Sequence, residues 1–320
     1  NTQKDANKHA GFLNWYLQQN LLNKTQNFIW IVSQNAGEID LGMGVNISKK
    51  PFPKLEGILS KIEFFIRSVI IIFTVFFRLV FGSWWAPILF DELITLAYFQ
   101  SLGKSKYATK YLFNNSQFHL RPLWTYLAEA SGSQIIMAYY SNNVEPYEYK
   151  DGRERPVYPG YKTQNWPEYL VWSKKQENFF REQNQRIKSK FHLVGPIPFI
   201  DKPISIPKLP RNSIAVFDIT TQNAAELARL GLYADYFSVS NLTDFLESIY
   251  KAIYRNNCIM VLKHKRTINN GLVDPIYLKL IDNLSELDNV INVDPDISAE
   301  RIVCKTMGSI SLPFTSTALI

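Results

Sequence analysis

Cationic and hydroxyl side chains follow two predicted strands near the end of the chain. The basic run Lys263–Arg266 comes directly after the apolar stretch Cys258–Leu262, and the hydroxyl run Thr315–Thr317 follows Ser309–Leu312. Concentrated cations bind phosphates, and hydroxyls beside a helix N-terminus add further donors. We predict that these two runs hold a nucleotide's phosphates; a solvated basic loop and N-capping hydroxyls are the alternatives. The predicted phosphate ligands are Lys263, His264, Lys265, Arg266, Thr315, Ser316 and Thr317.

Acidic side chains suited to general-base catalysis lie much earlier in the chain. Asp91 and Glu92 follow an apolar segment, and a carboxylate near an acceptor hydroxyl can take its proton during group transfer. Adjacent acids in the first turn of a helix also suit the helix dipole, so a structural role stays open. His119 and Arg121 form a second candidate pair. We predict no metal site, because the D-x-D string at 294–296 fits helix capping better than metal binding.

The 320-residue chain is basic, with a formal net charge of +7 and a pI of about 9.1. A phosphate-bearing substrate, an anionic membrane surface or a nucleic acid would each suit this charge. No basic cluster is longer than Lys263–Arg266, whereas nucleic-acid interfaces gather many cations with exposed aromatics. We therefore expect no nucleic-acid partner. Cys258 and Cys304 are expected to be buried thiols in a reducing compartment.

The stretch from 58 to 83 is almost continuously apolar. Its polar exceptions recur at helical spacing and fall on one narrow face: Glu63, Arg67, Thr74 and Arg78. The uncharged part between the two arginines is about 15 Å long as a helix, about half the thickness of a hydrocarbon core. We expect a helix lying in a membrane interface, with Trp84 and Trp85 as anchors. A spanning helix and a buried helical hairpin are the alternatives.

The order of predicted elements favours an α/β fold with two doubly wound domains. A proline-rich stretch at 198–210 separates two alternations of strands and helices, which predicts an N-terminal domain of 1–200 and a C-terminal domain of 211–320. The segment Gly37–Pro53 is expected to be a loop. Because an apolar run stops at Ile320, we expect the second domain to be truncated. The clearest predicted strands are Gln134–Tyr140, Tyr169–Trp172, Phe191–Pro196, Ser213–Asp218, Cys258–Leu262 and Val290–Val293.

A short string at Pro313–Ser316 resembles the bacterial polysaccharide-biosynthesis proteins that are named for their PFTS motif. Further segments that look shared are Phe118–Trp124, Tyr169–Trp172, Val194–Pro196 and Ile214–Asp218. The resemblance covers most of 118–320 and implies two Rossmann-like lobes in a GT-B-like arrangement, with the hydrophobic helix inserted in the first. Walker, G-x-G-x-x-G and G-x-S-x-G motifs are absent.

The resemblance implies a glycosyltransferase. Similar transferases pair a basic or His-Pro motif with a later hydroxyl motif to hold a cytidine nucleotide's phosphates. His264 is followed here by Lys265, so the donor nucleotide stays open. The family layout would make 1–200 the acceptor side and 211–320 the donor-binding side. No cofactor is expected, because GT-B enzymes generally stabilise the leaving phosphate with side chains and helix ends.

The expected partners are a nucleotide-sugar donor, a glycan or lipid-linked acceptor, and a membrane surface. They place the protein in the cytoplasm, peripheral on the inner face of the cell membrane. Two alternatives stay open. One is transfer of a polyol phosphate from a CDP-activated donor, and the other is a non-catalytic, membrane-associated factor in polysaccharide assembly.

Overall fold

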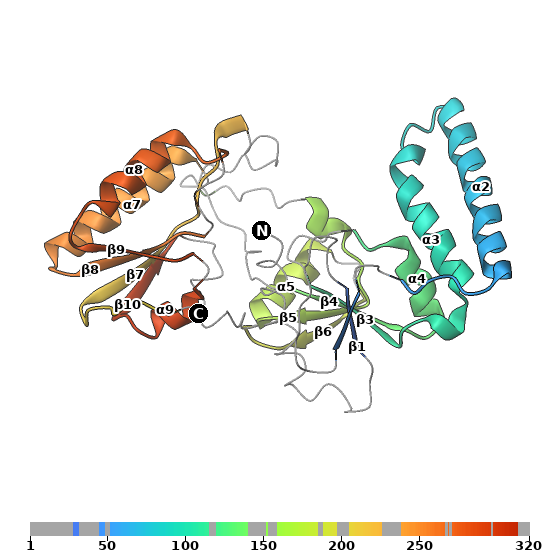
Figure 1. Ribbon diagram of the computed structural model, residues 1–320, viewed down its shortest axis with the longest axis horizontal. Helices are drawn as coiled ribbons and strands as arrows, with labels where there is room; N and C mark the ends of the chain where they lie inside the picture. Colours follow the sequence, from blue (N-terminus) through green and yellow to red (C-terminus); the bar gives the residue numbers. More distant parts are fainter. Residues whose placement is uncertain are drawn as a thin grey trace. The chain divides into compact units, whose positions relative to one another are not determined.

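The computed structural model describes residues 28–31, 45–48, 52–114, 120–139, 152, 159–184, 188–196, 205–225, 238–265, 268, 271–295 and 297–312. These residues form an α/β protein with two separate four-stranded parallel sheets (Figure 1). The chain divides into two compact units, one with the described residues from 28 to 196 and one with those from 205 to 312. Each unit holds one four-stranded sheet, and the first also holds the two-stranded sheet β1-β2, so the α/β class is as predicted.

The sheet of the first unit has the sequential strand order β3-β4-β5-β6, and each pair is parallel. Its core is rich in aromatic side chains, with Trp166 and Tyr169 fully buried and Phe113 packed 4.8 Å from Trp166 between ring centroids. The elements around it are β3 (Lys110–Asn114), α4 (Leu123–Ala130), β4 (Gln134–Ala138), η3 (Pro159–Thr163), β5 (Glu168–Val171), α5 (Lys174–Gln183) and β6 (Lys190–Leu193).

Helices α2 (Ile58–Val80) and α3 (Phe90–Leu102) pack side by side as a hairpin (Figure 1). Arg67 of α2 joins them, because it donates to Gln100 Oε1 of α3 at 3.0 Å; within α2 the same side chain pairs with Glu63 at 2.7 Å. The turn contains η1 (Ala86–Leu89), and η2 (Lys104–Lys106) follows α3.

Helix α2 has no buried residue, so a buried core hairpin does not describe this segment. Among the described residues, no helix is both long and apolar enough to cross a membrane.

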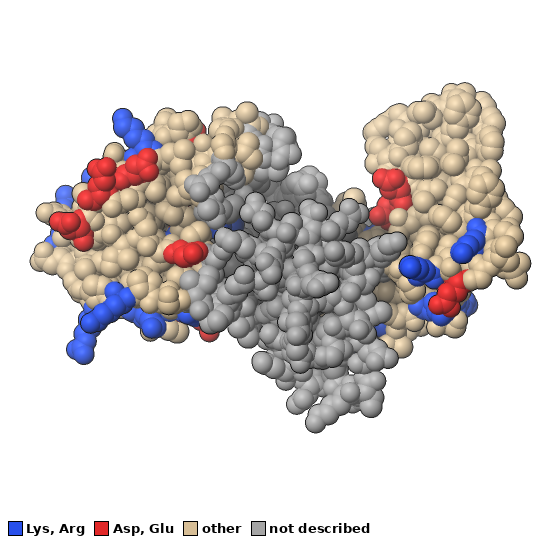
Figure 2. All heavy atoms as spheres, viewed as in Figure 1, with Lys and Arg blue, Asp and Glu red and all other residues tan. Residues whose placement is uncertain are grey.

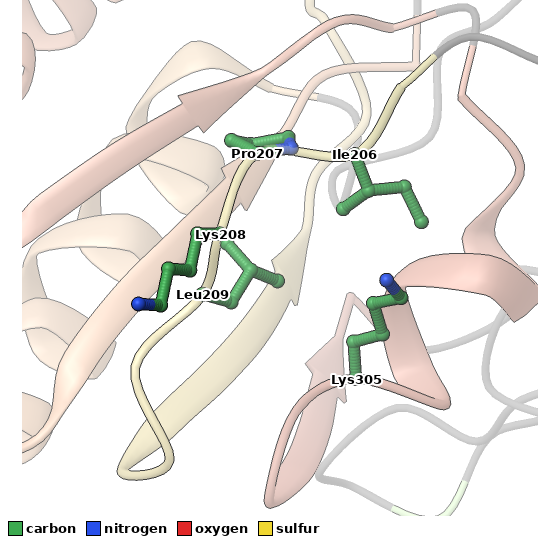
Figure 3. Close-up of a pocket in the computed structure, with 5 residues that line it drawn as sticks. All are labelled: Ile206, Pro207, Lys208, Leu209 and Lys305. Carbon is green, nitrogen blue, oxygen red and sulfur yellow. The ribbon is translucent and has the colours of Figure 1, made fainter.

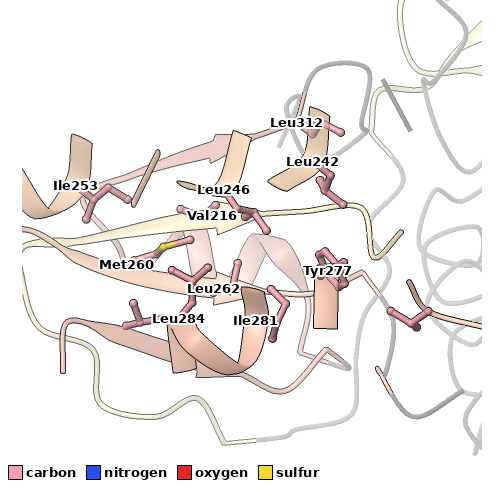
Figure 4. Close-up of a cluster of buried hydrophobic side chains, with 12 residues drawn as sticks. Val216, Leu242, Leu246, Ile253, Met260, Leu262, Tyr277, Ile281, Leu284 and Leu312 are labelled. Atoms are coloured by element: carbon pink, nitrogen blue, oxygen red, sulfur yellow. The ribbon is translucent and has the colours of Figure 1, made fainter. Parts of the chain in front are cut away.

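The sheet of the second unit has the order β10-β7-β8-β9, again with every pair parallel. Apolar side chains of α7 and α8 cover one face, where Leu246 and Tyr277 pack with Leu262 (Figure 4). The other face packs against α9 through Ile302. The elements are β7 (Ser213–Phe217), α7 (Val239–Arg255), β8 (Ile259–Lys263), α8 (Pro275–Ser285), β9 (Val290–Val293), α9 (Ala299–Val303) and β10 (Gly308–Ser311).

Several details differ from the sequence-based expectations. Strand β2 (Val45–Ser48) lies in the segment expected to be a loop and pairs in parallel with β1 (Phe28–Ile31). Strand β3 was not predicted, because its Lys-Tyr-Leu-Phe-Asn sequence lacks a run of branched apolar residues. Cys304 is exposed and Cys258 half-buried, so the expectation of buried thiols is wrong. Cys304 is the C-cap residue of α9, and Cys258 directly precedes β8, so both lie where the chain enters or leaves an element.

Candidate functional site

The carboxyl ends of the second unit's strands lie at one edge of the sheet, because all four strands are parallel. The chain passes from β7 to β8 to β9 in one direction and then crosses back to β10 on the other side of β7. Such a reversal is a topological switch point, and open α/β sheets bind ligands just beyond the strand ends there. In the first unit, the described strands follow one another without a reversal. The second unit therefore holds the stronger candidate edge.

Three polar side chains form a buried cluster at this edge. Asp218 directly follows β7, His264 directly follows β8, and Tyr277 lies in the first turn of α8. The His264 Nδ1 atom lies 3.0 Å from Asp218 Oδ2 and 3.0 Å from the Tyr277 hydroxyl. The Tyr277 hydroxyl donates a short hydrogen bond to the same Asp218 oxygen. The side chain of Asp218 is 0% exposed and that of His264 is 7% exposed, so the contacts are shielded from bulk water.

Backbone contacts between two segments far apart in the sequence bring Tyr277 to the strand ends. The loop after β7 forms an antiparallel bridge between Gln222 and Val273, and the Asn223 N–H donates to the Leu272 carbonyl at 2.8 Å. Asp274 then caps α8 by accepting from the Ile276 N–H at 2.8 Å. A capped helix start held beside the loop therefore fixes where the tyrosine lies.

Electrostatics keep the Tyr277 hydroxyl protonated. Burial raises the pKa of Tyr277 well above its ordinary value, and the negative charge and hydrogen bond of Asp218 raise it further. A hydrogen bond with the Thr220 side chain acts in the opposite direction. The phenol is therefore a donor to Asp218. The second carboxylate oxygen, Asp218 Oδ1, is buried and has no hydrogen-bond partner among the described residues.

The predicted phosphate ligands are partly described. Lys263 ends β8, and its ammonium donates to the Pro295 carbonyl at 3.0 Å, which links β8 to the loop after β9. Lys265 is exposed. Strands β8 and β10 both flank β7, so the segments that follow them start from the same sheet edge. Arg266, Thr315, Ser316 and Thr317 lie outside the described residues.

The predicted general bases lie in the first turn of α3. Glu92 Oε2 accepts a hydrogen bond from the Leu123 N–H at 2.9 Å and so caps α4, whose own N-cap residue, Pro122, makes no side-chain cap. Asp91 is exposed. The contact gives Glu92 a structural role, and the catalytic role of either acid stays a prediction.

The other candidates from sequence have structural contacts or lie outside the described residues. The Arg121 guanidinium donates to Thr125 Oγ1 at 2.9 Å, pairs with Glu129 at 2.5 Å and stacks 4.0 Å from the Tyr126 ring centroid. His119 and Asp296 are not described. Within the described ranges, no group of three or more His, Cys, Asp or Glu side chains could hold a metal ion.

An open pocket of about 460 Å³ lies elsewhere in the second unit. Ile206, Leu209 and Lys305 point toward its space, and Pro207 and Lys208 complete its lining (Figure 3). None of the buried cluster residues lines this pocket. It is therefore a different place from the candidate edge.

Sequence reasoning missed Asp218 and Tyr277 as site residues. Asp218 carries the same signal that singled out Lys263, a charged residue directly after a predicted apolar strand. Tyr277 carries no such signal, because it is an apolar-face position of α8 whose hydroxyl reaches the strand ends only in three dimensions.

Together, the fold and the site define an α/β protein with a buried Asp–His–Tyr cluster at the switch point of a parallel sheet. The chain belongs to the polysaccharide biosynthesis PFTS motif protein family, whose model matches residues 68–320. No curated protein matches the sequence. Among solved structures, the crystal structure of TarM has a TM-score of 0.38 and 12% identity, covering 68% of this chain and 39% of that one. A likeness this low carries no argument about function.

Proposed function

We propose that the protein is a GT-B-like glycosyltransferase that moves a sugar from a nucleotide-activated donor to a surface polysaccharide or a lipid-linked glycan. Membership of a polysaccharide-biosynthesis family supports the general process. The observation that supports the position of the donor site is the switch point between β7 and β10. Lys263 and His264 lie at the end of β8, the other neighbour of β7.

The chemistry of the edge suits a departing nucleotide. When the sugar leaves, negative charge grows on the phosphate oxygen that it leaves behind, and fixed cations and donors stabilise that charge. Lys263 and Lys265 supply ammonium groups, and Thr315 to Thr317 would add hydroxyls and helix N–H groups from the segment after β10.

On the acceptor side, Asp91 is the better candidate base of the two predicted acids, because the Glu92 carboxylate already accepts a hydrogen bond from the Leu123 N–H.

The outer face of α2 supports a location at a membrane surface. Phe64 and Arg67 contact α3, and large exposed apolar side chains cover about 180° of the helix on the opposite side, at 100° per residue. A helix that packs on a single core typically needs an apolar stripe of about 100°. These exposed side chains are Ile58, Leu59, Ile62, Phe65, Ile66, Ile70, Ile72, Phe73, Phe76, Phe77, Leu79 and Val80.

Over 58–102 three basic residues are matched by three acidic ones, but the part of the hairpin nearest its turn carries few charges. The segment from Phe64 to Phe90 contains Arg67 and Arg78 and no acidic residue. In the view of Figure 2, the end of the hairpin at the α2–α3 turn shows no charged side chain. Trp84, exposed at 72%, follows α2 as an interface-anchoring aromatic would. We propose that α2 lies along the inner membrane surface with its exposed apolar face against the lipid, near a lipid-linked acceptor.

The direct test of the function is a donor panel. Purified full-length protein with lipid vesicles is incubated with UDP-, GDP- and CMP-linked sugars and with CDP-linked polyols, and release of each nucleotide is measured. Release from one nucleotide sugar, strongly reduced by the Lys263→Ala change, supports a glycosyltransferase. Release from a CDP-linked polyol alone would show that the protein transfers a polyol phosphate and not a sugar. If no nucleotide is released, and calorimetry detects no nucleotide binding, only the role of an assembly factor is left.

A further inference from the structure

We propose that Asp218 and Tyr277 are positioning residues that hold the His264 ring so that its Nε2 atom contacts a phosphate of the donor. This inference rests on the donor site proposed above. It adds two residues that act through His264 rather than through contact with the donor. The geometry that carries it is the pair of 3.0 Å contacts that both end on His264 Nδ1.

The hydrogen bonds assign the ring's orientation. An ionised carboxylate only accepts hydrogen bonds, and the protonated Tyr277 hydroxyl already donates to Asp218 Oδ2. Nδ1 therefore carries a proton and donates it within this cluster, as a ring nitrogen held by a carboxylate does. Nε2 is left as the ring nitrogen that faces a ligand. When both nitrogens are protonated, Nε2–H donates to a phosphate oxygen while Asp218 balances the ring's positive charge.

A purely structural role would make the buried Asp218–His264–Tyr277 cluster costly in free energy. Replacing buried charged groups with apolar ones of the same size is often neutral or stabilising. Asp218 buries a carboxylate with one oxygen unpartnered among the described residues, directly beyond the strand that borders the switch point. A carboxylate that orients a histidine toward a bound group explains this arrangement, as outer contacts do for histidines that bind metals.

The first measurement concerns His264 alone and needs no nucleotide. Long-range ¹H–¹⁵N NMR spectra of the full-length protein, assigned with a His264→Gln variant, report which ring nitrogen carries the proton. We expect protonated Nδ1 in the wild type and a changed pattern in Asp218→Asn. A neutral ring protonated only at Nε2 in the wild type would overturn the positioning role, whatever the protein binds.

The second measurement is a double-mutant cycle in nucleotide binding. Calorimetry with UDP, GDP and CMP identifies the nucleotide that the wild type binds. We expect Asp218→Asn to weaken that affinity roughly tenfold or more, by analogy with losses of 10- to 100-fold for outer contacts. In a His264→Ala background the same change should have almost no further effect, because Asp218 acts through the ring.

An equal loss in both backgrounds would show a structural role and overturn the proposal. Tyr277→Phe is the milder variant if Asp218→Asn fails to fold; it keeps the ring and removes only the hydroxyl. It should weaken nucleotide affinity a few-fold with His264 present and not without it. A wild type that binds no nucleotide would remove the donor site itself, while the NMR result would still report on the ring's position.

Discussion

Lys263 directly precedes His264 and lies at the end of β8. A charge-assisted contact is typically worth about 1.5–3 kcal/mol, so Lys263→Ala should weaken nucleotide binding roughly tenfold or more. Ser316→Ala should cost less, because a neutral hydroxyl contributes less than a charge. Lys279→Ala, which removes an exposed lysine from α8, is the matched control and should leave affinity unchanged. Equal effects of Lys263→Ala and Lys279→Ala in calorimetry would argue against the site.

Glu92 allows its structural and catalytic roles to be separated. Its carboxylate caps α4 through the Leu123 N–H, so Glu92→Ala should lower the free energy of unfolding by about 1 kcal/mol. Glu92→Gln keeps an acceptor oxygen and should lower it much less. Urea unfolding of the two variants measures the difference. Equal destabilisation by Gln and Ala would show that the capping contact contributes little.

Asp91 is the matched test of general-base catalysis. Asp91→Asn keeps the size of the side chain and removes the base, and a general base typically contributes about 10²- to 10⁴-fold to a rate. We expect sugar transfer to fall by at least about 10²-fold while the melting temperature stays nearly unchanged, because Asp91 is exposed. Full activity of Asp91→Asn together with loss of activity in Glu92→Gln would move the base to Glu92.

The raised pKa of Tyr277 predicts a dependence of stability on alkaline pH. The folded state favours the protonated phenol, so its contribution is fully present below the unfolded tyrosine pKa of about 10 and is lost as pH rises above it. The free energy of unfolding should fall between pH 9 and 11, by up to about 1.4 kcal/mol per pH unit for one tyrosine. Tyr277→Phe should make that fall less steep, and the part that stays is due to other buried tyrosines such as Tyr139 and Tyr169. Parallel curves for wild type and variant would contradict the assignment.

At the scale of elements, the proposed membrane contact of α2 can be tested by substitution. Phe73, Phe76 and Phe77 are all exposed, so changing them to Ser should release protein from anionic vesicles without unfolding it. The matched control changes three exposed apolar residues of the second unit, Leu272, Ile276 and Met307, and should leave vesicle binding intact. Co-sedimentation measures both. Continued binding of the α2 variant would place the membrane contact elsewhere.

Strands could be predicted where apolar residues dominate an uninterrupted run. Strand β9 has the bounds expected from Val290–Val293, and β7 differs from its predicted range only by the loss of Asp218. Short, mixed strands such as β2 and β3 escaped prediction, since their pairing partners stabilise them rather than their own composition. Helix α9 is short, Ala299–Val303, because the chain turns at Cys304 to enter β10.

At the scale of the whole molecule, strand order was the part of the site that sequence could not supply. Polar residues after strands mark possible ligand contacts, and Lys263 and His264 were found in that way. Which strands are neighbours depends on crossover paths, and the return of β10 to the far side of β7 has no signature in sequence. Without that reversal the edge has no switch point, and Asp218 would be only one more charged residue after a strand.

We expect a nucleotide's phosphates to bind at the switch point of the second sheet. A crystal structure of the full-length protein soaked with UDP, GDP or CMP tests it most directly. We predict the phosphates within hydrogen-bonding distance of Lys263 and His264 Nε2 on one side and of Thr315 to Thr317 on the other. A nucleotide bound elsewhere, for example in the pocket beside Lys305, or phosphates that contact none of these residues, would contradict the account.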